Sequence, residues 1–134
     1  MPSAVGAPAY THVFPREVES AALARQLVRT VLETWHLPQL VDDAMHVVSE
    51  LVANAVDHAR GGHIRFTVTR TDDRRVRLAV VDKSHAEPVL RTVSPSEEHG
   101  RGLVIVDALS LKWGIDPLPW GKRTWADLEL EGAR

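Results

Sequence analysis

The chain has 134 residues, a formal net charge of −2 and no cysteine. This length suits one domain with its own core, and the lack of cysteine excludes zinc-thiolate sites, iron–sulfur clusters and a thiol nucleophile. A nearly neutral chain lacks the basic face that binds nucleic acid or an anionic membrane. Because no segment has the ~18 apolar residues of a membrane span and the first residues lack the features of a secretion signal, we expect a cytoplasmic protein.

The first half of the chain predicts two helices. Residues 1–9, mostly small residues and proline, predict a flexible tail before a single domain over residues 10–134. After a short apolar stretch, spacings of three and four predict an amphipathic helix over Glu17–Trp35. Pro38 suits the first turn of a second helix, which ends at about Ala59 before two glycines. The expected buried positions are Ala21, Ala24, Val28, Val31 and Trp35 in the first helix and Leu40, Ala44, Val47, Leu51 and Ala55 in the second.

The second half of the chain predicts strands and one further helix. Apolar residues alternate with polar ones over residues 64–68 and 76–80, which predicts a β-hairpin. Residues 83–99 have no period and contain two prolines, so we expect a long loop. A helix from Gly100 to Leu109 follows. Two closing strands are expected over Leu111–Ile115 and Lys122–Leu130, joined by a Pro-Trp-Gly turn.

One face of the second helix is polar. Most polar stripes are simply the solvated face of an amphipathic helix. Asn54 argues against that interpretation here, because asparagine is a poor helix former and this one lies one turn after Glu50. A carboxylate beside an amide oxygen can hold Mg²⁺ together with phosphate oxygens, so the pair resembles the floor of a nucleotide site. The stripe consists of Asp43, His46, Glu50, Asn54, Asp57 and His58.

Two further features fit a nucleotide but also have structural explanations. Asp82 ends the hairpin and is either a turn former or an acceptor for the amine of adenine, which guanine lacks at that place. Gly100 and Gly102 lie at the start of a helix whose free N–H groups suit a phosphate, although glycine is also common at ordinary loop-to-helix junctions. The spacings of a P-loop, a Rossmann fingerprint, a transition-metal site and a serine hydrolase are all missing.

The motifs in order resemble those of the GHKL (histidine kinase-like) ATPase superfamily. Residues 50–59, Glu-Leu-Val-Ala-Asn-Ala-Val-Asp-His-Ala, resemble its N-box. Val81-Asp82 looks like the start of the G1 box, residues 99–103 like the G2 box and residues 122–128 like the closing strand. The resemblance runs from about residue 12 to residue 131. It is strongest to the short single-domain anti-sigma factor serine kinases of actinomycete type, in which Trp113-Gly114 also looks familiar.

The resemblance implies an α+β fold of Bergerat type, a two-layer sandwich with a mixed, mostly antiparallel sheet and helices packed on one face. It implies ATP and Mg²⁺ as cofactors, with Asn54 coordinating Mg²⁺ and Glu50 acting as general base. Asp82 would bind the adenine amine, helped through water by Thr124, and His58 would lie near phosphate or ribose. The implied ATP-binding positions are Asn54, His58, Asp82, Gly100, Arg101, Gly102, Leu103 and Thr124.

The implied activity is that of a serine/threonine protein kinase. Histidine kinases of the superfamily often carry an amide where this chain has Glu50, because an imidazole is already a nucleophile whereas a hydroxyl profits from a base. The implied partners are a small antagonist protein as substrate, a sigma factor or similar sequestered target, and a second copy of the chain. These partners are expected to be separate chains, because 134 residues leave no room for a sensor or transducer domain.

Two alternatives remain open. Ser84 stands where the G1 box normally has glycine, which favours a nucleotide-binding switch that sequesters partners without catalysis. The other alternative is an α+β interaction module that binds no nucleotide.

Overall fold

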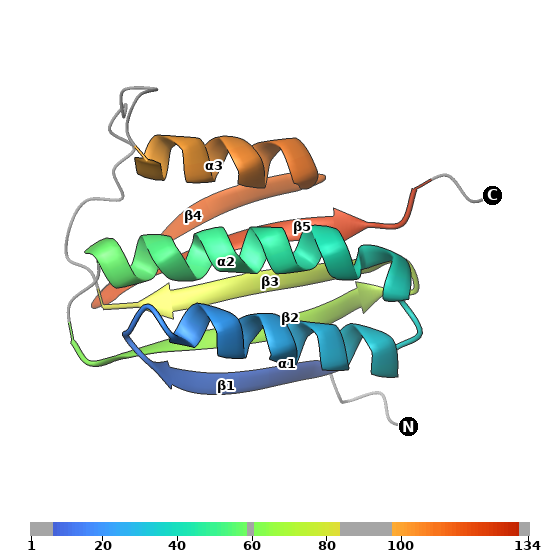
Figure 1. The fold of residues 1–134 in the computed structure, drawn as a ribbon, viewed down its shortest axis with the longest axis horizontal. Coiled ribbons are helices and arrows are strands. Elements are labelled where there is room, and N and C mark those ends of the chain that lie inside the picture. The colour runs from blue at the N-terminus through green and yellow to red at the C-terminus, as the bar shows by residue number, and fades with distance from the viewer. Residues whose placement is uncertain (1–6, 59–60, 84–97, 132–134) are drawn as a thin grey trace.

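The computed structural model describes residues 7–58, 61–83 and 98–131, without the side chains of His58 and residues 98–102. It has two layers, a five-stranded sheet and α-helices that cover one face of it (Figure 1). The strands lie in the order β1-β2-β3-β5-β4, and each neighbouring pair is antiparallel. The predicted α+β class is therefore confirmed, with a sheet that is antiparallel throughout the described residues.

The first two α-helices agree with the predicted apolar periodicity. They are α1 (Ser20–Thr34) and α2 (Val41–His58), and a short 3-10 helix, η1 (Pro38–Leu40), leads into α2. Of the ten predicted core positions, all are buried except Ala21, which is partly buried against the core. Burial of these two stripes against the sheet and against each other supplies the main drive for helix formation.

The hairpin consists of β2 (His63–Asp72) and β3 (Arg75–Asp82), close to its predicted bounds. Strand β1 (Ala9–Pro15) was not predicted, and it pairs with β2 so that Phe14 lies opposite Ile64. Phe14 is the only buried residue of β1, so the strand shows too little apolar alternation for a period of two to be recognised. The sheet accordingly begins at Ala9, inside the range expected to be a tail.

The last part of the chain forms α3 (Glu98–Leu109), β4 (Lys112–Leu118) and β5 (Gly121–Glu129). Helix α3 begins two residues before Gly100, the expected start, so Gly100 and Gly102 lie within its first two turns. Most of the predicted loop, residues 84–97, lies outside the described residues, and Ser84 with it.

The core lies between the sheet and the helices, with α2 at its centre. Helix α2 packs against α1, α3, β3 and β5. Buried side chains alternate along the strands, as in Ile64, Phe66 and Val68 of β2, because one face of the sheet lies under the helices. None of the helices in the described part of the chain has the length and hydropathy of a membrane span.

The sheet face away from the helices is held by charged pairs across strands. Arg77 of β3 donates two hydrogen bonds to Asp127 of β5, at 2.7 and 3.0 Å, and its guanidinium lies 4.0 Å from the ring centre of Trp125. The hydrogen bonds to Asp127 raise the pKa of Arg77 above its usual value, so the guanidinium stays charged. Trp125 packs on Gly114 of β4, where an added Cβ would lie 2.8 Å from the indole.

Candidate functional site

The polar stripe of α2 separates into two groups by burial. Asp43, His46 and Asp57 are exposed, whereas Glu50 and Asn54 are half-buried. A purely solvated face would leave all five exposed. Glu50 and Asn54 therefore lie at the border between the core and the outer surface of the helix, where a side chain can both be held in place and reach a ligand.

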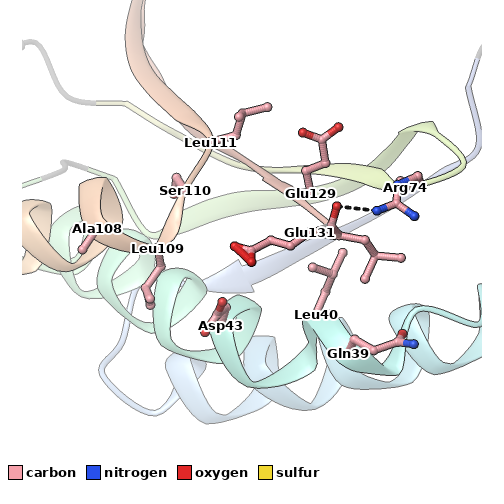
Figure 2. Close-up of a pocket in the computed structure, with 11 residues that line it drawn as sticks. Gln39, Leu40, Asp43, Arg74, Ala108, Leu109, Ser110, Leu111, Glu129 and Glu131 are labelled. Carbon is pink, nitrogen blue, oxygen red and sulfur yellow. Dashed lines mark hydrogen bonds between the residues drawn. The ribbon is translucent and has the colours of Figure 1, made fainter. Parts of the chain in front are cut away.

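Glu50 and Asn54 lie on the side of α2 that faces α3. Asp43 lines a cavity together with Ala108 and Leu109 of α3, which fixes the direction of that face (Figure 2). Glu50 follows Asp43 by seven residues and Asn54 follows Glu50 by four, spacings that return to the same side of an α-helix. The predicted carboxylate and amide therefore line the border between the second and third helices.

Asp82 is the last residue of β3, and only 2% of its surface is exposed. Directly opposite on β5 is Lys122, of which 5% is exposed. The Nζ atom of Lys122 lies 3.4 Å from Oδ1 and 3.3 Å from Oδ2 of Asp82. The predicted base-binding carboxylate is thus buried against an ammonium group, which favours its charged form.

Thr124 lies next to this pair on the same face of the sheet. It is opposite Val80 of β3 and is 2% exposed. Its Oγ1 atom is buried and has no hydrogen-bond partner among the described residues. An orphaned buried hydroxyl is uncommon, because burial of an unpaired polar group costs free energy. The hydroxyl therefore fits a water or a ligand atom that the purine-binding role would place there.

The fold gathers the predicted residues at one end of the molecule. The C-terminal end of α2, the N-terminal end of α3, the end of β3 and the start of β5 lie at the left in Figure 1. Amide N–H groups of the first turn of α3 lack partners within the helix, which suits a phosphate. Leu103 is half-buried. The residues carried by these four segments are Glu50, Asn54, His58, Asp82, Gly100, Arg101, Gly102, Leu103 and Thr124.

Sequence reasoning missed two residues of this end. An added Cβ on Gly121 would lie 2.0 Å from the backbone oxygen of Asp82, so only glycine permits this approach. Lys122 was assigned to a strand but not to the site. The signal was present, because Lys122 shares strand parity with Thr124, Ala126 and Leu128, and a lysine on a core-facing position needs a carboxylate partner.

Two cavities border the sheet. One of about 940 Å³ lies at the opposite end, where the start of α2 meets the ends of α3 and β5 (Figure 2). There the Arg74 guanidinium donates to the backbone oxygen of Leu130 at 2.8 Å. Another of about 310 Å³ is lined by Asp82, Lys83 and Trp120, and by residues of β1, β2 and β3. Neither cavity includes Glu50 or Asn54, so we place the candidate site by its residues.

A magnesium ion at this site would need only one or two protein ligands. No group of three or more histidine, aspartate or glutamate side chains gathers in the parts of the chain that the structure describes. A site that encloses a cation entirely with protein ligands is therefore not formed by those residues. Mg²⁺ commonly takes only one or two protein oxygens and completes its shell with water and substrate phosphates, which the Asn54 amide and Glu50 carboxylate suit.

Comparison with known protein families finds one matching family model. The family model described as "Histidine kinase-like ATPase domain" matches residues 14–121, which is more than half of the chain. A search of curated proteins found no significant match. The matched range contains the described parts of α2, β3 and α3 that carry most of the candidate site.

Proposed function

Because the chain belongs to the histidine kinase-like ATPase family, we propose that it is an ATP-binding regulatory protein with serine/threonine kinase activity of the anti-sigma-factor type. The observation that carries the proposal is the arrangement at one end of the sheet. Asp82 is buried at a strand end, the Thr124 hydroxyl beside it has no described partner, and α2 lies above with Glu50 and Asn54. These features support the inference that an acceptor for a purine amine and oxygen groups for a metal–phosphate complex serve one site.

The base-binding part of the site consists of Asp82 and Thr124. An ionised carboxylate only accepts hydrogen bonds, and the exocyclic group of adenine donates them. The Thr124 hydroxyl both donates and accepts, so it can bind a ring nitrogen directly or through water. Because both side chains are buried, a base that seats there loses most of its contact with solvent, which strengthens each hydrogen bond.

The phosphate part of the site consists of Asn54, Glu50 and the first turn of α3. Bound Mg²⁺ supplies charge neutralisation for the transferring phosphoryl group. Asn54 would hold the ion through its amide oxygen, and the amide N–H groups at the start of α3 would hold phosphate oxygens. Glu50 accepts the proton of an attacking hydroxyl, since it lies one turn from Asn54 on the same helix face.

The proposed partners follow from the kind of group that accepts the phosphate. A glutamate base is of use to a serine or threonine hydroxyl and of little use to an imidazole, so the acceptor is a hydroxyl on a small antagonist protein. Phosphorylation of that protein would then control whether the chain holds it or a sigma factor or similar target. Pairing of two copies of the chain is part of the same proposal.

Replacement of Glu50 by glutamine tests the catalytic assignment. We expect Glu50→Gln to lower phosphate transfer from labelled ATP to an antagonist protein by about a hundredfold or more, with ATP affinity within about threefold of the original. The matched control is Glu33→Gln on α1, a glutamate whose side chain is 57% exposed and forms an ion pair with Arg29 of the same helix. The control should transfer at the original rate.

The chemical stability of the product tests the acceptor class. A phosphoserine or phosphothreonine ester survives acid, whereas a phosphoramidate on histidine does not. An acid-labile product, or a Glu50→Gln variant that transfers at the original rate, would contradict the proposal. ATP binding by the original chain without transfer or hydrolysis would instead identify the non-catalytic switch.

A further inference from the structure

Helix α3 carries apolar side chains on its outer side as well as on its inner side. On the inner side, Val106 is buried and Leu109 packs against the core. On the outer side, Val104 is 66% exposed and Ile105 is 38% exposed. A surface helix of a soluble protein normally has polar residues there, and a helix that is apolar all round is typical of a buried position. The outer side of α3 therefore suits a contact with another molecule.

The apolar outer side leads from α3 into a cavity. Ala108 is exposed one turn after Val104, and Leu111, which is 52% exposed, follows in the connection to β4. Ala108 and Leu111 also line the cavity of about 940 Å³ (Figure 2). Single exposed apolar side chains are ordinary, whereas a continuous patch marks an interaction surface. We call Val104, Ile105, Ala108 and Leu111 the apolar strip.

The cavity next to the apolar strip is acidic. Its lining includes the carboxylates of Asp43, Glu129 and Glu131, with Arg74 as the one cation among the described residues that line it. Glu129 is paired with Arg75 at 3.4 Å. Asp43 and Glu131 are exposed, and neither has a hydrogen bond or an ion pair within the described part of the chain. These two carboxylates therefore carry charge that a cationic group of another molecule can neutralise.

The charge of the cavity determines which kind of molecule suits it. Carboxylates repel nucleic acid and anionic membranes. A single metal ion is not favoured, because no three acidic or histidine side chains in the described ranges are grouped closely enough to hold one. A helix with an apolar stripe and neighbouring lysine or arginine residues has the complementary character. Its stripe can cover exposed apolar side chains at helical spacing while its cations meet the carboxylates.

We propose that the apolar strip and the acidic cavity together bind a basic amphipathic helix of a partner protein. The apolar stripe of that helix packs on Val104, Ile105 and Leu111, and its lysine or arginine side chains reach Asp43 and Glu131. The inference goes beyond the proposed function, because none of these residues is assigned to the nucleotide or to phosphate transfer.

Two labelled peptides of about 18 residues serve as probes. One has leucine and lysine at helical spacing, and the other has glutamate in place of each lysine with the same apolar stripe. We expect the original chain to bind the leucine–lysine peptide at least about tenfold more tightly, measured by fluorescence anisotropy. Val104→Gln should weaken this binding about fivefold or more. Glu131→Gln should weaken it about twofold to fivefold and reduce its dependence on salt.

Matched controls place the same changes on α1. Leu23→Gln replaces an apolar side chain that is 50% exposed, and Glu33→Gln replaces an exposed carboxylate. Both should bind the leucine–lysine peptide as the original chain does. Because Val104 and Glu131 are also exposed, all four variants should keep the melting temperature of the original chain.

Three results would overturn the inference. The original chain could bind the leucine–lysine peptide no better than the leucine–glutamate peptide, or Leu23→Gln could weaken binding as much as Val104→Gln. The third result is a dimer in analytical ultracentrifugation that Val104→Gln dissociates, which would show that a second copy of the chain covers the apolar strip. None of these results depends on ATP, so they are distinguishable from a failure of the proposed function.

Discussion

Individual carboxylates of this protein differ in what surrounds them. Asp82 lies buried opposite a lysine, Asp127 is buried beneath Arg77, and Asp116 is partly exposed beside Arg123. Only Asp82 belongs to the candidate site. The other two hold strands together on the face of the sheet away from the helices.

The pair of Asp116 and Arg123 gives a prediction for acid stability. The hydrogen bond from Arg123, 2.7 Å long, lowers the pKa of Asp116 below its ordinary value of 3.8. A lowered pKa in the folded state means that the stabilisation is complete above pH 3.8 and disappears as pH falls through the folded-state value. Because both side chains are more than two-fifths exposed, the contribution is only about 0.2–1 kcal/mol.

The measurement is urea unfolding of the original chain and of Asp116→Asn at several pH values. The variant should be less stable by that amount at pH 7, and the difference should shrink below pH 3.8. A difference that grows on acidification would show that the pair does not stabilise the fold in this way.

Residue types and spacing predicted Glu50 and Asn54 correctly as neighbours on one helix, and Asp82 as the end of a strand. They did not predict Lys122 as the partner of Asp82, because that contact depends on the register between β3 and β5. Helical spacing is local, whereas strand register joins residues forty positions apart.

At the scale of elements, a helix or strand could be predicted from the sequence when it buries several regularly spaced apolar residues. Helices α1 and α2 bury long apolar stripes and were found, whereas β1 buries only Phe14 and was missed. The start of α3 was placed at Gly100 because glycine usually marks a helix boundary, yet the helix continues through both glycines.

Gly121 shows how one element constrains the next. Strand β5 begins there, and its missing side chain lets the end of β3 approach, since an added Cβ would lie 2.0 Å from the Asp82 oxygen. That atom belongs to backbone and has little room to move. We expect Gly121→Ala to destabilise the fold by about 2–4 kcal/mol, measured by chemical denaturation.

Gly62→Ala is the matched control, because nothing lies within 4 Å of a Cβ at that position. It should change the free energy of unfolding by less than about 1 kcal/mol. A Gly121→Ala variant as stable as the control would show that the two strand ends separate at little cost.

At the scale of the whole molecule, the two ends of the sheet have different characters. One end carries the C-terminal part of α2 with Asn54, the end of β3 with Asp82 and the start of β5 with Thr124, and the other carries the cavity of about 940 Å³ (Figure 2). Helices α2 and α3 run between the two ends. The fold class followed from the order of motifs, but the strand order β1-β2-β3-β5-β4 required the structure, because it depends on pairings between distant segments.

The central claim is that this end of the sheet binds ATP, and thermal unfolding with and without millimolar Mg-ATP tests it most directly. A ligand that binds only the folded state raises the melting temperature, by about 5–10 °C at a hundredfold excess over Kd. We predict such a rise for the original chain and for the exposed-turn variant Asp73→Asn, a smaller one with GTP, and none for Asp82→Asn. An original chain whose melting temperature does not change with Mg-ATP would contradict the account.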